Sequence, residues 1–141
     1  MVEPDNKMGI RRIGTHNDIL GECPLWDEQR QCLYWIDIRS PAIHRMDGAT
    51  QAIQSWPMPS MVGSIALTRT SRLLVALTTH FALFDPENEE LETYLTPPPM
   101  PEGHRFNDGR CDRQGRFWVG TMHNLTRAPE GVLYCLQGQE L

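Results

Sequence analysis

Two oxygen-bearing side chains, Glu22 and Asn107, occupy the same place in two related stretches of this sequence. Glu22 lies five residues before Asp27, and Asn107 lies five residues before Asp112. A third related stretch has Gly63 at this position. A carboxylate and an amide oxygen are hard ligands of the kind that Ca²⁺ or Mg²⁺ prefers. If both side chains point toward a common axis, they could hold one divalent cation.

A cationic side chain accompanies this pair. Arg105 lies two residues before Asn107. Its guanidinium group is planar and offers a fork of hydrogen-bond donors, a geometry suited to an anionic or hydroxyl-rich substrate. The candidate site therefore combines oxygen ligands for a metal ion with a donor for a small molecule.

An ordinary interpretation competes with this one. Residues 21–24 could form a surface turn, and residues 107–109, Asn-Asp-Gly, are a common turn signal. Each segment taken alone favours a turn. Their shared position favours a site, because unrelated turns need not place polar ligands at equivalent points of a repeat.

The elements that must position these residues come from that repeat. The anchors Asp27, Thr68 and Asp112 lie about 41 and then about 44 residues apart, and a polar turn and a short apolar run follow each of them. This period is in the range of roughly 40–50 residues that is typical of four-stranded propeller blades. The repeats cover about residues 20–57, 61–96 and 105–141.

The runs inside the repeats have the character of β-strands. Residues 33–36 and 117–119 are short and rich in aromatic and β-branched side chains. Asp47-Gly48 and residues 85–88 are turn signals that bound such runs. No stretch of about a dozen residues keeps the apolar spacing of an amphipathic helix. The sequence therefore predicts an all-β fold.

The third repeat ends before a fourth strand can follow. The first two repeats each have a fourth strand, near residues 52–56 and 91–95, whereas the third reaches Leu141. Closed propellers have roughly 4–8 blades, and this chain supplies about three. We expect a single partial β-propeller domain over residues 1–141, in which residues 10–20 could form a strand that closes the missing last blade. Open blade edges also predict self-association.

Several motifs resemble the SMP-30/gluconolactonase/luciferin-regenerating enzyme-like family. They lie between residues 14 and 136, in the family's order and spacing. They are Gly-Glu-Cys-Pro-Leu-Trp at 21–26, Leu-Tyr-Trp-Ile-Asp at 33–37, Arg-Phe-Asn-Asp-Gly-Arg at 105–110 and Gly-Arg-Phe-Trp-Val-Gly-Thr-Met at 115–122. The second motif alone is also similar to the YWTD repeats of receptor propellers, and the first and third separate the two families.

The resemblance implies a six-bladed ring with one catalytic divalent metal ion (Ca²⁺, Zn²⁺, Mn²⁺ or Mg²⁺) in its channel. The implied activity is hydrolysis of a sugar lactone or another small lactone. Glu22 then matches a metal-ligand carboxylate, and Arg105 and Asn107 match the substrate-contacting pair. The family's other metal ligands, an Asn and an Asp that would serve as general base, are expected beyond residue 141, so the isolated chain is expected to be inactive. Animal members carry an acid shortly after Gly-Thr-Met, whereas residues 123–126 here contain none, which leaves the substrate preference open.

Composition excludes other function classes. The formal net charge is −5, and no cluster of Lys and Arg suits a nucleic-acid partner. The longest apolar run, residues 73–77, is far shorter than the ~20 residues of a membrane span. The first seven residues contain no apolar leader segment, which predicts a cytoplasmic protein with reduced cysteines. Neither the four cysteines nor the five histidines show the spacing of a structural zinc site.

Two alternatives remain open at this stage. The chain could be a non-catalytic propeller module that presents one face to a protein partner, with Glu22 and Asn107 as turn residues. It could also be a naturally truncated gene product without a stable fold.

Overall fold

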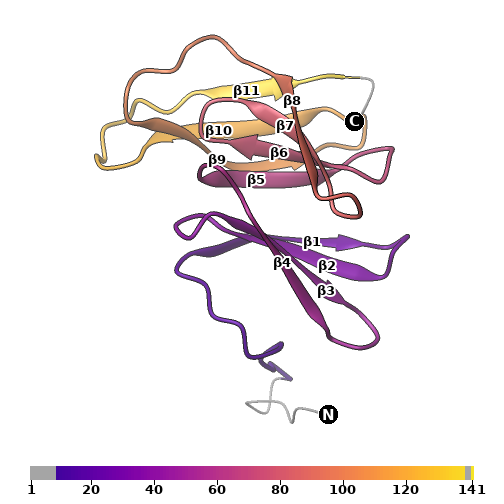
Figure 1. Ribbon diagram of the computed structural model, residues 1–141. Coiled ribbons are helices and arrows are strands. Elements are labelled where there is room, and N and C mark those ends of the chain that lie inside the picture. Colours follow the sequence, from indigo (N-terminus) through magenta and orange to yellow (C-terminus); the bar gives the residue numbers. More distant parts are fainter. Residues whose placement is uncertain (1–8, 139–140) are drawn as a thin grey trace.

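The computed structural model describes residues 9–138 and Leu141, which form three antiparallel β-sheets and contain no helix (Figure 1). The first sheet contains β1 (Gly21–Asp27), β2 (Cys32–Asp37), β3 (Ala42–Asp47) and β4 (Ile53–Pro57). The second contains β5 (Val62–Leu67), β6 (Leu73–Leu77), β7 (Phe81–Asp85) and β8 (Glu90–Leu95). The third contains β9 (His104–Cys111), β10 (Phe117–His123) and β11 (Leu133–Leu136). The prediction of an all-β fold is confirmed.

Each sheet is built from one of the three related stretches, and strands that are neighbours in sequence pair with each other. The third sheet has three strands. Residues 9–20 form no strand, so the strand expected to close a last blade stays a prediction, as do the number of blades and the domain limits. Residues 1–8, on which the expectation about a leader rests, and residues 139–140 lie outside the described residues. No helix within the described residues is long and apolar enough to cross a membrane.

The three repeat anchors have the same structural role. Asp27 ends β1, Thr68 directly follows β5 and Asp112 directly follows β9, and the side-chain oxygen of each accepts a hydrogen bond from the backbone N–H two residues later. The bonds run from Gln29 N to Asp27 Oδ1 (3.0 Å), from Thr70 N to Thr68 Oγ1 (3.2 Å) and from Gln114 N to Asp112 Oδ1 (2.9 Å). An Asp and a Thr can therefore stand at equivalent places, because both supply the oxygen that the turn needs.

The first strands of the three sheets lie side by side, with β5 between β1 and β9 (Figure 1). Each of them pairs irregularly with the second strand of its own sheet. The irregularity lies between Glu22 and Leu25 in β1, between Val62 and Ser64 in β5, and opposite Gly120 in β9. Such bulges redirect side chains locally. The hypothesis that residues 21–24 and 107–109 are turns is wrong, because both segments lie within strands.

Gly63 is the point at which β5 and β9 come closest. A Cβ atom at Gly63 would lie 2.4 Å from the carbonyl oxygen of Phe106 and 2.9 Å from the backbone nitrogen of Asn107. No side chain fits there. The middle repeat therefore has glycine where the outer repeats have Glu22 and Asn107, because the backbone of β9 fills that space.

Apolar side chains fill the two spaces between the sheets. Alternation along a strand sends one set of side chains to each face of a sheet. The core between the first and second sheets includes Tyr34, Ile36, Ile43, Val62, Ile65 and Leu77. The core between the second and third sheets includes Leu74, Phe81, Phe106, Phe117 and Val119.

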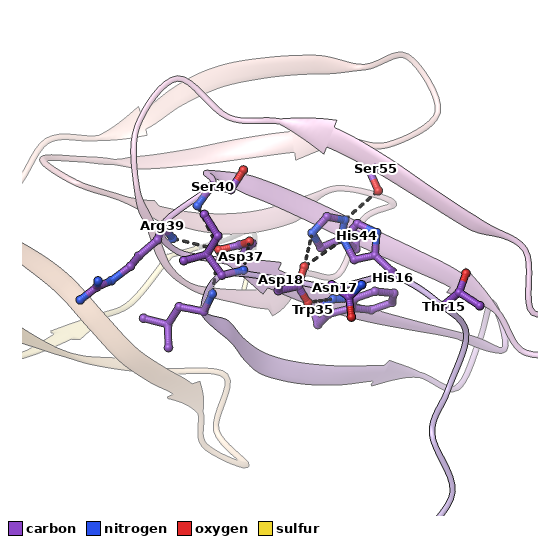
Figure 2. Close-up of polar contacts among 12 residues, drawn as sticks. Thr15, His16, Asn17, Asp18, Trp35, Asp37, Arg39, Ser40, His44 and Ser55 are labelled. Carbon is purple, nitrogen blue, oxygen red and sulfur yellow. Dashed lines mark hydrogen bonds and ion pairs between the residues drawn. The ribbon is translucent and has the colours of Figure 1, made fainter.

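Asp37 fastens the segment before β1 to the end of β2 (Figure 2). Its carboxylate is 3% exposed and accepts backbone N–H bonds from Ile19 (2.8 Å), Leu20 (3.2 Å), Arg39 (3.0 Å) and Ser40 (3.0 Å). Burial acts to raise the pKa of Asp37, but these four hydrogen bonds outweigh it and lower the pKa below its ordinary value. Asp37 therefore stabilises the fold in its charged form.

Replacement of Gly63 by alanine is expected to lower the free energy of unfolding by about 1–3 kcal/mol, because the added methyl group meets backbone that cannot rotate away. Gly120→Ala is the control, since the nearest atom to its added Cβ is 3.9 Å away. Urea unfolding of both variants measures the difference. Equal stability of the two variants would contradict the close approach of β5 and β9.

The Asp37→Asn variant is expected to lose stability at neutral pH and to show a weaker dependence of stability on pH. A lowered pKa means that the folded state releases its proton more readily than the unfolded chain, so this stabilisation is complete above pH ~5 and is lost as the pH falls through the ordinary Asp pKa of about 3.9 and below. Urea unfolding between pH 7 and pH 3 tests this, with the exposed Glu90→Gln as control. Parallel pH curves for wild type and Asp37→Asn would show that the carboxylate contributes nothing.

Candidate functional site

Among the predicted site residues, Arg105 makes the most side-chain hydrogen bonds to described residues. It lies near the start of β9, is 6% exposed, and its guanidinium group makes three hydrogen bonds to the protein. Nε donates to Asn124 Oδ1 at 2.9 Å, and Nη1 donates to the Phe106 carbonyl oxygen at 2.9 Å and to Asn107 Oδ1 at 3.1 Å. Arg105 and Asn107, the predicted substrate pair, are therefore in direct contact.

The charge of Arg105 is affected by neighbours on the first sheet. Burial lowers its pKa, the positive charge of Arg39 lowers it further, and the carboxylate of Glu22 acts in the opposite direction. Glu22 is the second residue of β1 and Arg105 is the second residue of β9, on either side of β5. Although 83 residues separate them in the sequence, the charge of Glu22 acts on Arg105.

Glu22 is exposed, and its carboxylate has no hydrogen bond or ion pair with any described residue. It borders a hollow of about 560 Å³ that runs along β1, β5 and β9 and is also lined by Asp108 and Arg110. Arg105 and Asn124 border a different hollow of about 710 Å³, between the second and third sheets. Glu22 and Arg105 therefore line two different hollows.

The donor atoms of Glu22 and Asn107 suit a hard divalent cation in part. The Glu22 carboxylate is free, and the half-buried Asn107 side chain uses its amide oxygen for one bond, which leaves a second lone pair on that oxygen. A Ca²⁺ ion takes six to eight oxygen ligands. These two residues fit such an ion but supply only a minority of its ligands.

The cysteine beside Glu22 has a structural role. The Cys23 sulfur accepts a hydrogen bond from the backbone N–H of Ile65 at 3.5 Å, which links β1 to β5. Burial is the main cause of a raised pKa of the Cys23 thiol. A protonated, packed thiol is a poor nucleophile. All four cysteines are free, as the sequence predicted.

Asn124 is a site residue that sequence reasoning missed. Its side-chain oxygen accepts a hydrogen bond from Arg105 Nε and so orients the guanidinium group. Its backbone N–H donates to the Gly103 carbonyl oxygen at 2.8 Å. The register of β9 and β10, in which His104 pairs with His123, brings Asn124 next to Arg105. A correct prediction of that register would have found it.

The structure also brings together three residues whose sequence spacing does not predict a metal site. His16, Asp18 and His44 place one ligand atom each within 4.8 Å of one another. His16 and Asp18 lie in the segment before β1, and His44 lies in β3, so no sequence interval signals the group.

Comparison with known proteins gives consistent results. Residues 20–141 match the model of the SMP-30/gluconolactonase/LRE-like region. The chain is 38% identical over 113 residues to a 6-deoxy-6-sulfogluconolactonase of Pseudomonas putida, covering 80% of this chain and 39% of that protein. It is 34% identical over 118 residues to a putative sugar lactone lactonase of Bacillus subtilis, covering 84% of this chain and 40% of that protein. The chain thus spans about two fifths of the length of the curated relatives that it matches.

Two solved structures share the fold. A calcium-binding protein, regucalcin, from Agrobacterium tumefaciens superposes with a TM-score of 0.79 and 26% identity, over 84% of this chain and 40% of that chain. A luciferin-regenerating enzyme superposes with a TM-score of 0.77 and 26% identity, over 85% of this chain and 43% of that chain.

Replacement of Asn124 by alanine is expected to free the Arg105 Nε–H and to lower the free energy of unfolding by about 1–3 kcal/mol, because a buried donor loses its acceptor. The slowly exchanging Nε–H signal of Arg105 in an NMR spectrum should vanish. Asn17→Ala, which removes the acceptor of the exposed Arg12 Nη2, should leave that signal in place. Persistence of the Arg105 signal in Asn124→Ala would show that Asn124 does not position the guanidinium group.

Proposed function

Because this chain belongs to the SMP-30/gluconolactonase/LRE-like family, we propose that it forms part of the channel of a divalent-metal-dependent hydrolase of a sugar lactone or another small lactone. The observation that carries this proposal is the hydrogen bond between Arg105 and Asn107 in β9. The carboxylate of Glu22 in β1 is near enough to act on the pKa of Arg105. Relatives that are named lactonases support the same activity.

In this proposal Glu22 and Asn107 hold the metal ion from the side of this chain. A bound divalent cation polarises a carbonyl oxygen and lowers the pKa of a bound water molecule. The remaining ligands and the general base are proposed to come from the part of a six-bladed ring that lies beyond residue 141. The relative described as a calcium-binding protein makes Ca²⁺ a reasonable first choice among Ca²⁺, Zn²⁺, Mn²⁺ and Mg²⁺.

Arg105 is proposed to bind the substrate through Nη2. Its Nε–H and both Nη1–H groups already donate to protein oxygens, so the two Nη2–H groups are the donors that no described residue uses. Because three bonds hold the guanidinium plane, Nη2 has a fixed direction and loses little conformational freedom when a ligand binds. The two N–H groups of Nη2 point in different directions, so they can donate to two separate hydroxyl oxygens of a sugar lactone.

Exposed apolar side chains beside β11 support the proposal that the complete site requires further blades. Beside and along β11, Val132 and Leu133 are 51% and 66% exposed, and Leu125 after β10 is 87% exposed. Exposed apolar groups next to an unpaired strand favour association with another chain or with further blades. Self-association of the isolated chain and its placement in the cytoplasm remain part of the proposal, and so does inactivity of the chain by itself.

Calorimetric titration of the 141-residue chain with Ca²⁺ is expected to show weak binding and no hydrolysis of gluconolactone, because two oxygen ligands hold the ion poorly. Glu22→Gln should weaken that binding about tenfold or more, because it removes the only negative charge of the pair. The exposed Glu90→Gln is the matched control and should bind as wild type does.

The same substitution in a form that contains the complete ring distinguishes the enzyme from the non-catalytic alternative. An enzyme should lose lactonase activity in Glu22→Gln, whereas a protein-interaction module should be unaffected. Tight Ca²⁺ binding with turnover by the 141-residue chain would show that the proposed division of the site is wrong.

A further inference from the structure

A cluster of two histidines and one aspartate lies on the first sheet (Figure 2). The register of β2, β3 and β4 places Trp35, His44 and Ser55 directly opposite one another. They lie on the face that points away from the core, whose side chains come from alternate positions such as Ile36 and Ile43. The segment before β1 crosses this face and carries the other two members of the cluster.

The three ligand atoms of this cluster face one another at close range. Asp18 Oδ1 lies 2.9 Å from His16 Nε2 and 3.1 Å from His44 Nε2. His44 is 3% exposed, and its Nε2 and Asp18 Oδ1 are fully buried without a hydrogen bond of acceptable geometry to any described residue. Buried polar atoms are rarely left in this state, and an ion between them is one explanation.

Each ligand is oriented by a second contact. His44 Nδ1 lies 2.7 Å from Ser55 Oγ, and the indole N–H of Trp35 donates to Asp18 Oδ2 at 2.9 Å. The rings of His16 and Trp35 pack edge to face, with centroids 6.2 Å apart. In the tautomer whose Nδ1–H donates to Ser55, the lone pair of His44 Nε2 faces a carboxylate oxygen. Such outer contacts are characteristic of histidine and carboxylate metal ligands.

Burial is the largest influence on the pKa of His44 and lowers it, while the Asp18 carboxylate acts in the opposite direction without reversing the shift. His16 lies in the segment before β1 and is more exposed than His44.

We propose that His16, Asp18 and His44 form a binding site for one first-row transition-metal cation, with Zn²⁺ as the ion that this donor set suits best. Two imidazole nitrogens and one carboxylate are typical zinc ligands, whereas Ca²⁺ and Mg²⁺ prefer oxygen atoms only. Ligand atoms of a tetrahedral zinc ion are about 3.3 Å apart, given bonds of about 2.0–2.1 Å. The two histidine–aspartate separations need to grow by only a few tenths of an ångström, and the two histidine nitrogens lie within 4.8 Å of one another.

The surroundings leave room for a fourth ligand. A hollow of about 160 Å³ borders His16, Asp18 and Trp35 and opens beside Ile13 and Leu33. A water molecule can enter there and complete the coordination. The bound ion would connect the segment before β1 to β3 through His16, Asp18 and His44. Asp37 connects the same segment to the end of β2, through the backbone of Ile19 and Leu20.

This inference is independent of the proposed lactonase activity, and substitutions at His16 and Asp18 on one side and at Glu22 on the other separate the two sites. The 141-residue chain without a histidine tag is titrated with Zn²⁺ by calorimetry and with Co²⁺ by visible absorption. One equivalent of Zn²⁺ is expected to bind, to raise the melting temperature and to displace Co²⁺, and millimolar Ca²⁺ should not compete.

Substitutions locate the ion. His16→Gln and Asp18→Asn should each weaken Zn²⁺ binding at least tenfold while the circular dichroism spectrum stays unchanged, and Ser55→Ala should weaken it about 10- to 100-fold through loss of the contact to His44. Glu90→Gln and His123→Gln are the controls and should bind Zn²⁺ as wild type does.

The proposal is overturned if the wild-type chain binds no stoichiometric Zn²⁺, which would leave the cluster as a hydrogen-bonded His–Asp–His network. It is also overturned if the double variant His16→Gln/Asp18→Asn, folded by circular dichroism, keeps wild-type affinity. Loss of Zn²⁺ binding in His123→Gln, with binding kept in His16→Gln, would place the ion beside β10 and would equally refute this site.

Discussion

The close approach of β5 and β9 at Gly63 is the constraint on which the site depends. The backbone of Phe106 and Asn107 occupies the space that a side chain at this position would need. With β5 this close to β9 on one side and linked to β1 through Cys23 and Ile65 on the other, the first strands of all three sheets are held in one layer. A larger residue at Gly63 would move β9 away, together with Arg105.

The bulges in these strands change the direction in which side chains of the candidate site point. In a regular strand, side chains alternate between the two faces of a sheet, and apolar cores fill the spaces between the three sheets. An irregular pairing at Glu22 and at Asn107 lets a polar side chain leave that alternation at the end of the strand. Arg105 then keeps its buried charge because Asn124, Asn107 and a carbonyl oxygen accept three of its N–H groups.

Two donor sets of different chemistry occur in the first sheet and its surroundings. The end of β1 offers a carboxylate in an exposed setting with an amide nearby, which suits a hard and incompletely held cation. His44 of β3, together with His16 and Asp18 from the segment that crosses the first sheet, offers two imidazoles and a carboxylate. The two sets therefore prefer different ions.

The sequence by itself determined the secondary structure class, the repeat, the anchors Asp27, Thr68 and Asp112, and the residue types of the candidate site. These features are local, since a turn needs an oxygen acceptor and a strand needs short apolar runs within a few residues of the chain. The family likeness rests on the same local motifs. The sequence also predicts that Glu22 and Asn107 are equivalent, and by itself it left open that both lie in turns.

Only the tertiary structure decided which distant side chains meet. The role of Asn124 depends on the register between β9 and β10, and the group of His16, Asp18 and His44 depends on the path of the segment that crosses the first sheet. Neither the register nor that path follows from residue spacing, because both are set by packing between elements that are far apart in the chain. Glycine at position 63 has the same origin: its sequence context is ordinary, and the reason for it is the neighbouring backbone of β9.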